Sequence, residues 1–275
     1  MFISRDLVYL ELQKTGSTHI RRVLKDLLGG RIIGKHNQAS SNLFTEGRYF
    51  LGSIRDPWEW YTSLWAFGCD HKGALYKQVT RQGPYFKGLG WKTNFFAAFL
   101  GLLSRMTGNP KNWEDTFQDV NDPDAFRTWL YMIHDLKNFR YIGEGYGSVM
   151  FCQFAGFLTF RYVKLYCTKV EEISNLYDLS TYDQLKNYER EYCFVDRFVR
   201  NESLEVDLFS ALKKFGLDVP VNKKNEVISR KKTNASSKKH GPRYYYDSIS
   251  ENLVSRRERL IIDKFGYIPP STRDS

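Results

Sequence analysis

The first 67 residues alternate short apolar runs with segments of helical periodicity, and this alternation restricts the fold more than any other feature of the chain. Apolar runs at residues 7–12, 31–35 and 48–54 predict strands, while residues 18–28 and 57–67 have the spacing of helices. Strands that alternate with helices form a parallel sheet with the helices against its faces. The sequence therefore predicts an α/β protein with a central parallel sheet flanked by helices.

The rest of the chain continues this pattern and shows no boundary between two domains. With 275 residues it can form one substantial core, and no Pro, Gly and Ser-rich linker separates two parts, so we expect a single domain over residues 1–275. Residues 69–124, rich in Gly, Pro, Asn and aromatic residues, are interpreted as a helical or irregular insertion over the active edge of the sheet. Further helices are expected at residues 124–136, 203–215 and 248–266, and further strands at residues 161–167 and 192–198.

The chain is strongly basic, which favours anionic partners. Lys and Arg total 41 against 31 Asp and Glu, for a formal net charge of +10. Nucleic acid, an anionic membrane surface, a nucleotide cofactor and an acidic polysaccharide all fit such a charge. The basic residues are scattered except at residues 230–243, within a C-terminal basic loop and helix at about residues 229–268. Charge alone does not choose among these partners.

Cysteine usage and hydropathy indicate a reduced, cytoplasmic protein. The four cysteines lie far apart with no CxxC pair, which suggests neither a metal site nor a disulfide framework. The N-terminal residues lack a basic segment followed by an apolar run, and the most apolar later stretch, residues 151–160, is too short to span a bilayer. We therefore expect a soluble protein without a transmembrane segment.

The turn between the first strand and the first helix concentrates groups that bind anions. Lys14 and Gly16 stand there beside three hydroxyl residues, Thr15, Ser17 and Thr18. A tight turn directs backbone N–H groups outward, and the helix N-terminus adds partial positive charge. Because the lysine precedes the glycine, the turn is not a Walker A loop. The turn is interpreted as a cradle for a phosphate or phosphosulfate group, with an ordinary strand-to-helix turn as the alternative.

A second group of polar residues follows the strand at residues 48–54. Arg55 stands at the end of this strand, and Ser63 lies two turns into the next helix. The planar guanidinium suits a phosphate, and ligands of open α/β sheets lie at the carboxyl ends of the strands. The Lys14 turn belongs to the same edge. The two motifs are therefore expected to meet one bipolar ligand.

These motifs resemble those of the PAPS-dependent sulfotransferase family, in particular its carbohydrate-type and bacterial members. The family's 5′-phosphosulfate loop reads PKT-G-[ST]-[ST], and residues 13–18 read QKTGST. The family's 3′-phosphate motif reads RDP with a serine eight residues after the arginine, as at residues 55–63. Residues 195–207 and the basic segment at residues 233–239 are also similar to family stretches. Gln13 departs from the usual proline.

The resemblance implies a fold, a donor and the residues that bind it. The fold would be a P-loop-like three-layer one, and the donor 3′-phosphoadenosine 5′-phosphosulfate (PAPS), with adenosine 3′,5′-bisphosphate as the product. Lys14 would contact the bridging oxygen and leaving group. The other expected cofactor-binding residues are Thr15, Gly16, Ser17 and Thr18 for the 5′-phosphosulfate, Arg55 and Ser63 for the 3′-phosphate, and Lys238, with Lys239 and Arg243, as a clamp.

His36 is the expected general base. It follows the strand at residues 31–35, at the same edge of the sheet, and an imidazole has a suitable pKa near neutral pH. A histidine after this strand is the proposed base in some glycan-type members of the family. A solvent-facing loop histidine is the alternative reading, and Glu11 and Glu59 are weaker alternatives as the base.

The expected activity is thus transfer of a sulfuryl group to a hydroxyl of an acceptor that the sequence does not identify, with a glycan or small molecule favoured. Two other functions fit parts of the sequence. A nucleic-acid-binding module would use the basic loop and tyrosines, and a P-loop-type nucleotide kinase would use the Lys14 turn. The kinase would also need a metal-holding acidic residue, for which no convincing candidate follows a later strand.

Overall fold

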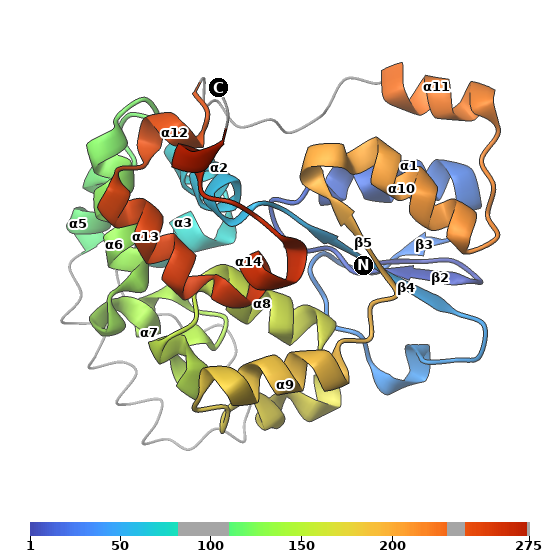
Figure 1. Cartoon of the computed structure of the whole chain (residues 1–275), viewed down its shortest axis with the longest axis horizontal. Helices are drawn as coiled ribbons and strands as arrows, with labels where there is room; N and C mark the ends of the chain where they lie inside the picture. The colour runs from blue at the N-terminus through green and yellow to red at the C-terminus, as the bar shows by residue number, and fades with distance from the viewer. Residues whose placement is uncertain (82–109, 230–239, 274–275) are drawn as a thin grey trace.

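The computed structural model describes residues 1–81, 110–229 and 240–273, and it contains one five-stranded sheet with the strand order β3-β1-β2-β4-β5 (Figure 1). The strands are β1 (Phe2–Ile3), β2 (Leu7–Tyr9), β3 (Arg31–Ile32), β4 (Tyr49–Ile54) and β5 (Arg197–Arg200). The chain is therefore an α/β protein with a small mixed sheet.

The predicted parallel sheet is correct for the neighbouring strands β2, β4 and β5, but β1 runs in the opposite direction and lies between β2 and β3. β2, β4 and β5 are parallel, with Val8 opposite Phe50 and Leu51 opposite Arg197. β1 pairs antiparallel with both β2 and β3. This two-residue strand was not predicted, because a segment so short carries no periodic signal. Since β2 and β3 are both antiparallel to β1, they run in the same direction and end at the same edge.

Helices cover both faces of the sheet. On one face, Tyr9 and Leu51 belong to a cluster of buried residues with α1 (Ser17–Leu28) and α10 (Leu204–Lys214). On the other face, Val8 and Phe50 pack in a larger cluster that includes α2 (Pro57–Cys69) and α8 (Phe157–Tyr166). Figure 1 shows α1 and α10 together on one side of the strands, with α8 on the other. Strands buried on both faces explain the nearly continuous apolar runs of β2 and β4.

The α2 helix is more deeply buried than its sequence predicted. Asp56 caps it, with its side chain accepting from the Glu59 N–H, and Pro57 occupies the first turn. Trp58, Tyr61, Leu64 and Trp65, whose spacing in the sequence places them on one face of a helix, are buried. Trp60, Thr62, Ser63 and Ala66 are buried as well. The helix is enclosed because α6, α12 and α13 pack around the sides that the sheet leaves uncovered.

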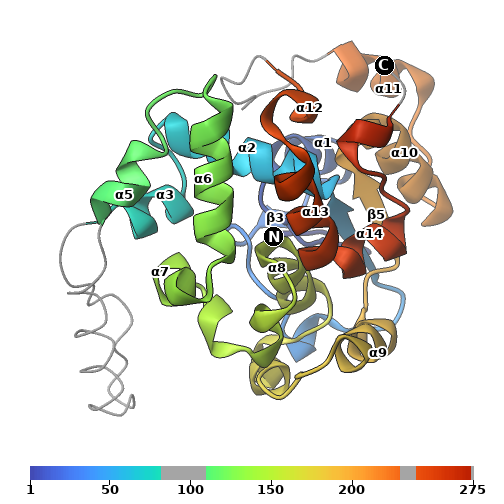
Figure 2. The ribbon, with the colours of Figure 1, turned by 60° about the vertical axis from the view of Figure 1, so that its left-hand side comes forward.

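Most of the other helices extend this second layer, whereas α11 packs against α10 in the first. Figure 2 shows α6 standing beside α13, and residues of the two are in contact. Their bounds are α3 (Ala74–Val79), α5 (Pro110–Asp115), α6 (Pro123–His134), α7 (Phe139–Ile142), α9 (Tyr182–Tyr192), α11 (Val221–Ser229), α12 (Pro242–Tyr245), α13 (Ser248–Arg257) and α14 (Arg259–Phe265). Short 3-10 helices lie at Ser41–Leu43, Leu136–Asn138, Tyr146–Ser148, Met150–Gln153, Val170–Leu176, Asn201–Ser203 and Pro270–Thr272.

The strand predicted at residues 161–167 is wrong, because these residues belong to helix α8. Almost every residue of α8 is buried, including Arg161 and Tyr162. A helix buried on all sides has no polar stripe, so its aromatic and β-branched residues resemble a buried strand. The strand predicted at residues 192–198 forms later, as β5, because α9 continues to Tyr192.

The helix predicted at residues 248–266 is divided at Glu258 into α13 and α14. Its N-cap is Asp247, paired with Ser250 in a capping box, one residue before the predicted start. Of the predicted insertion at residues 69–124, the described part consists mainly of α3 and α5. No helix in the described ranges combines the length and apolar composition needed to cross a membrane.

Candidate functional site

The turn from β2 to α1 has the backbone of a ligand-binding loop. Lys14 and Gly16 both have positive φ angles, 64° and 77°. Gly16 lies directly beneath the start of α10, where an added Cβ would stand 2.4 Å from Leu204 Cδ1 and 2.9 Å from Asn201 Nδ2. Only glycine fits this conformation and this contact. The turn is therefore held between the end of β2 and the residues that follow β5.

The Thr15 hydroxyl is directed into the interior of the protein. Thr15 is fully buried, and its Oγ1 donates to the Leu12 carbonyl at 2.8 Å. The same atom lies 2.7 Å from Ser53 Oγ, which lies 2.9 Å from Tyr9 OH. Because the carbonyl can only accept, Ser53 donates to Thr15 and Tyr9 donates to Ser53. Thr15 thus fixes the turn to the sheet, and its backbone N–H is the group that it can offer to a ligand.

Ser17 and Thr18 occupy the first turn of α1, next to Lys14. Ser17 is buried and Thr18 is half-buried. The first backbone N–H groups of any helix lack intrahelical acceptors, and they carry partial positive charge. The Lys14 ammonium lies 4.0 Å from the centre of the Phe67 ring of α2. The turn therefore combines a full and a partial positive charge, as an anion site requires.

Arg55 joins the two predicted motifs. Its Nη1 donates to the Lys14 carbonyl at 3.2 Å, and its Nη2 donates to the Glu59 carboxylate at 2.8 Å. Its Nε is buried and has no hydrogen-bond partner among the described residues. A buried guanidinium donor without a partner is costly, and an anion bound beside it would remove that cost. The end of β4 and the Lys14 turn are therefore in direct contact at one edge of the sheet.

The residue after Arg55 is held by a network of acidic groups. The Asp56 backbone N–H donates to Glu202 at 2.8 Å, and the Asp56 carboxylate accepts from Arg273 at 2.5 Å. Burial raises the pKa of Asp56 to about 6. Asp196 accepts from the Phe50 N–H at 2.7 Å in the same way. Two acidic residues of the stretch at residues 195–207, Asp196 and Glu202, therefore hold β4 and the residue that follows Arg55 in place.

The remaining residues predicted to bind the cofactor are Ser63 and those of the basic loop. Ser63 lies in α2 and is only 4% exposed. Its hydroxyl is thus enclosed in the conformation described here. Lys238 and Lys239 lie outside the described residues. Arg243 is exposed in α12, and Tyr246, the residue after this helix, donates to the Trp58 carbonyl at 3.1 Å.

His36 lies at the same edge of the sheet, held in one tautomer. Its Nδ1 lies 2.7 Å from the Glu11 carbonyl. Since a carbonyl only accepts, Nδ1 carries the proton and the lone pair is on Nε2. Burial lowers the pKa of His36, assisted by the charge of Arg161 and opposed by the hydrogen bond to Glu11. The imidazole is therefore neutral near pH 7 and has a basic nitrogen available.

The alternative bases are already engaged. The Glu11 carboxylate is almost fully buried and accepts from Arg21 at 3.0 Å. Glu59 forms its ion pair with Arg55 at 2.8 Å. Both carboxylates thus accept from a guanidinium, whereas the hydrogen bond of His36 leaves a lone pair on its Nε2.

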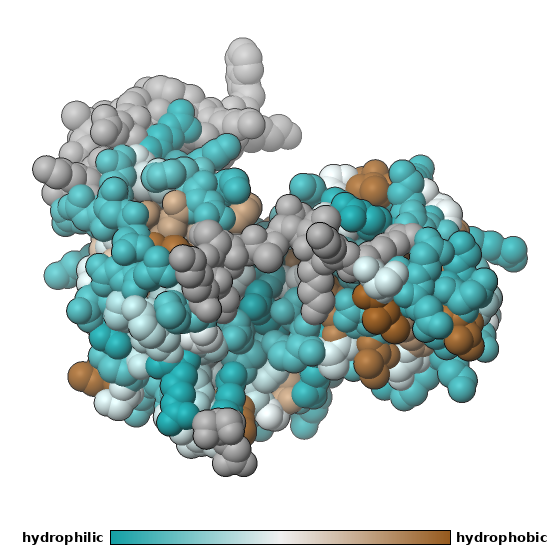
Figure 3. Space-filling model, turned by 90° about the horizontal axis from the view of Figure 1, so that it is seen from above, coloured by the Kyte–Doolittle hydropathy of each residue, from teal (hydrophilic) through white to brown (hydrophobic). Residues whose placement is uncertain are grey.

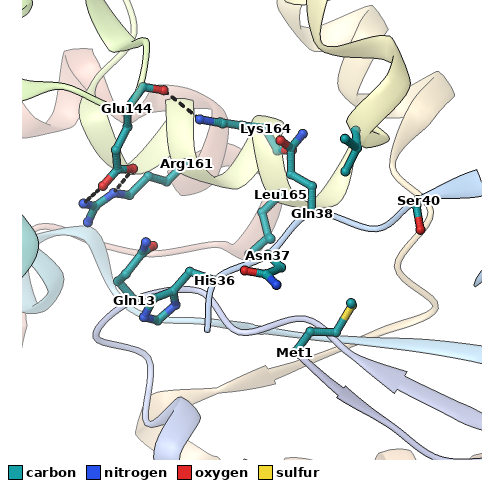
Figure 4. A pocket seen from close by; sticks show the side chains of 11 residues that line it. Met1, Gln13, His36, Asn37, Gln38, Ser40, Glu144, Arg161, Lys164 and Leu165 are labelled. Atoms are coloured by element: carbon teal, nitrogen blue, oxygen red, sulfur yellow. Dashed lines mark hydrogen bonds and ion pairs between the residues drawn. The ribbon is translucent and has the colours of Figure 1, made fainter. Parts of the chain in front are cut away.

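His36 faces a cavity of about 480 Å³ that also reaches the anion-binding turn (Figure 4). The wall is shared by the start of the turn, the loop after β3 and helix α8. It includes Gln13, His36, Gln38, Glu144, Arg161 and Lys164. Because Gln13 directly precedes Lys14, the wall of the cavity adjoins the start of this turn.

Three charged residues of this cavity were not identified from the sequence. Arg161 forms a bidentate ion pair with Glu144, with Nε–Oε2 at 3.1 Å and Nη2–Oε1 at 2.6 Å. Lys164 Nζ donates to the Glu144 carbonyl at 2.6 Å. Burial alone would raise the pKa of Glu144, but the charge and hydrogen bonds of Arg161, together with the charge of Lys164, lower it. Arg161 and Lys164 are three residues apart, which would have revealed a shared face only if the segment had been read as a helix.

Comparison of the chain with protein-family models, with curated proteins and with solved structures yields no match. The contacts within the chain itself therefore carry the functional interpretation. They bring together the turn that carries Lys14, an unsatisfied guanidinium donor, a neutral imidazole and a polar cavity.

Proposed function

We propose that the chain is a sulfotransferase that moves a sulfuryl group from PAPS to a hydroxyl of an acceptor. The hydrogen bond from Arg55 to the Lys14 carbonyl carries the proposal, because it joins the two motifs that resemble the family's 5′- and 3′-phosphate sites. We also propose that the sheet is the core of a P-loop-like three-layer fold, with α1 and α10 on one face and α8 on the other.

The donor would be held by groups that the turn presents outward. The backbone N–H groups of Thr15, Gly16 and Ser17, with the Thr18 hydroxyl, would bind the 5′-phosphosulfate. The unsatisfied Nε of Arg55 would bind the 3′-phosphate. Ser63 would join it after a local movement that exposes its hydroxyl. Lys238 completes the proposed set.

In the proposed mechanism His36 removes the proton from the acceptor hydroxyl. Its Nδ1–H is held by the Glu11 carbonyl, so Nε2 takes the proton. Lys14 stabilises the negative charge that grows on the leaving phosphate. The acceptor occupies the cavity between them, which orients its hydroxyl. Sulfuryl transfer resembles phosphoryl transfer in these demands.

Ligand-induced stabilisation tests the donor site. Adenosine 3′,5′-bisphosphate at 100 times its Kd would stabilise the protein by about 2.7 kcal/mol, measured as a rise in Tm. Arg55→Gln should remove most of this rise. Arg190→Gln, an exposed charge-matched control on α9, should retain it. The proposal is wrong if the bisphosphate leaves the wild-type Tm unchanged.

The same experiment separates the two other functions. Stabilisation by ATP with Mg²⁺, and not by the bisphosphate, would favour a nucleotide kinase. Preferential binding of oligonucleotides, with an affinity that falls steeply with salt, would favour a nucleic-acid-binding module. Labelled PAPS offered with a panel of hydroxyl compounds would then test the transfer itself.

A further inference from the structure

We propose that the cavity beside His36 binds an oxyanion, a carboxylate, sulfate or phosphate group, through Arg161 and Lys164, and that the acceptor therefore carries such a group near its reactive hydroxyl. Identifying this ligand as the acceptor rests on the proposed sulfotransferase function. The oxyanion site itself rests on the cavity and its charges.

Arg161 has a donor that the protein does not satisfy. The residue is only 5% exposed, and Glu144 engages its Nε and Nη2. Its Nη1 is buried and has no hydrogen-bond partner in the described ranges of the chain. The Phe157 ring lies 4.1 Å from the guanidinium carbon and restrains its plane. A fixed cation with an unmet donor is suited to an anion whose oxygens can reach it.

Lys164 adds a second positive charge on the same face of α8. It follows Arg161 by three residues, so both side chains project to one side of the helix and line the cavity (Figure 4). Its Nζ donates to a backbone carbonyl, which leaves two of its three protons for a ligand. Burial lowers the pKa of Lys164, an effect that a bound anion would oppose. The wall contains two cationic side chains, Arg161 and Lys164, and one carboxylate, Glu144. The cavity therefore has an excess of positive charge.

An oxyanion at this position would also act on His36. The Arg161 charge contributes to the lowered pKa of His36, second to burial among the causes that lower it. A bound anion would offset that charge and stabilise the imidazolium formed when His36 takes the proton. Recognition of the anion would thus increase the basicity of the residue that activates the hydroxyl. A neutral acceptor would fill the same cavity without this effect.

The hydrophobic surface that is visible from above lies away from this cavity. Viewed from above, the described surface is mainly hydrophilic, and hydrophobic residues gather toward the side of α10 and α11 (Figure 3). The cavity lies on the other side of the sheet, against α8. The formal net charge of +10 would also increase the encounter rate with an anionic ligand.

Sulfate ion is the probe for the oxyanion site, because it needs no knowledge of the acceptor. We would follow the ring signals of His36 by NMR, assigned with His36→Gln, while sulfate replaces chloride at constant ionic strength. Sulfate should raise the pKa of His36. The response should persist in Lys14→Gln, which separates the cavity from the anion-binding turn. A His36 signal that does not respond to sulfate would overturn the inference.

Variants of the wall decide which residues bind the anion. Lys164→Gln should weaken sulfate binding at least fivefold, and Glu144→Gln should strengthen it. Lys186→Gln, an exposed charge-matched control on α9, should leave it unchanged. Arg161→Gln should also weaken sulfate binding. If this variant does not fold because Glu144 has lost its partner, Lys164→Gln and Glu144→Gln still test the site. Equal weakening in Lys164→Gln and Lys186→Gln would show a general effect of net charge and refute the site.

The two proposals can fail separately. Sulfate binding beside His36 without stabilisation by the bisphosphate would keep the oxyanion site and reject the sulfotransferase. Stabilisation by the bisphosphate without a response of His36 to sulfate would keep the sulfotransferase and reject the oxyanion site. If both hold, 4-nitrophenyl β-D-glucuronide should bind at least fivefold more tightly than 4-nitrophenyl β-D-glucoside, from which it differs by a carboxylate. Equal affinities would exclude a carboxylate as the bound group and leave sulfate and phosphate esters as the groups to which the acceptor site responds.

Discussion

The side-chain oxygens of Thr15 and Ser53 lie 2.7 Å apart and join the anion-binding turn to the strand that carries Arg55. Tyr166 of α8 contacts the same strand residue, donating to the Ser53 carbonyl at 2.8 Å and accepting from its N–H at 3.0 Å. Ser53 therefore connects the turn, the sheet and the helix that lines the cavity. The positions of the proposed donor and acceptor sites are coupled through this one residue.

Thr15→Val should destabilise the fold by about 1–3 kcal/mol, because it leaves the buried hydroxyl of Ser53 and the Leu12 carbonyl without their partner. Urea unfolding measures the change. Thr18→Val, at a half-buried position in the same turn, should cost less than about 1 kcal/mol and weaken bisphosphate binding instead. Equal stability losses in the two variants would contradict the internal role of Thr15.

Lys14→Met should lower the rate of sulfuryl transfer by about 100-fold or more, because the growing charge on the leaving group loses its cation. Single-turnover measurements with labelled PAPS would report the chemical step. Bisphosphate binding should weaken less than the rate, since the backbone N–H groups of the turn remain. A variant whose rate and binding fall by the same factor would limit Lys14 to binding.

His36→Gln should reduce turnover by about 10²–10⁴-fold while bisphosphate still stabilises the protein. In the wild type the rate should fall as the pH decreases, because protonated His36 cannot accept the proton. Since burial lowers the pKa of His36, this loss should occur below the ordinary pKa of an imidazole. A pH–rate profile measures it, and an unchanged acidic limb in His36→Gln would remove His36 as the base.

Gly156→Ala should destabilise the protein by at least about 2 kcal/mol through overpacking. An added Cβ would stand 1.9 Å from Oε1 of Glu258, a fully buried carboxylate that accepts from the N–H groups of Leu158 and Thr159. Gly216→Ala is the matched control for space, since nothing lies near its added Cβ, although its φ of 75° adds backbone strain. Equal Tm values for the wild type and Gly156→Ala would contradict this packing.

Cys193 should be the most reactive thiol at neutral pH. A hydrogen bond from Cys167, with Lys264 Nζ at 3.7 Å, lowers the pKa of Cys193 to about 6. Cys69 is similarly half-buried, but burial raises its pKa to about 12. The thiolate is the nucleophile, so alkylation of Cys193 by iodoacetamide should rise through about pH 6 and then level off.

Peptide mass spectrometry after brief labelling at pH 7 would identify the modified residue. Cys69 provides the control, because it should react only in strongly alkaline solution. Labelling of Cys69 as fast as Cys193, or a Cys193 rate that still increases tenfold per pH unit above pH 8, would show that Cys193 is not ionised at neutral pH.

The elements near the N-terminus were predictable because their signals are local. β2, α1, β4 and α2 lie close to their expected positions, since apolar periodicity, Pro57 and the Asp56 cap act within a few residues. Helix α8 was not predictable, because burial on every side removed the polar stripe that identifies a helix. The short strand β1 was not predictable either, because two residues carry no periodic signal. Its antiparallel pairing makes the sheet mixed.

The sequence by itself determined the tight turn between β2 and α1 and the expectation that Arg55 lies at the same edge of the sheet. Backbone conformation at Gly16 and the order of strand, turn and helix are short-range properties, which residues close in the chain decide. Only the tertiary structure decided that the Thr15 hydroxyl is internal and that Arg161 and Lys164 face His36. These contacts join residues far apart in the chain, and they arise from how the buried helix α8 packs on the sheet, which no local pattern specifies.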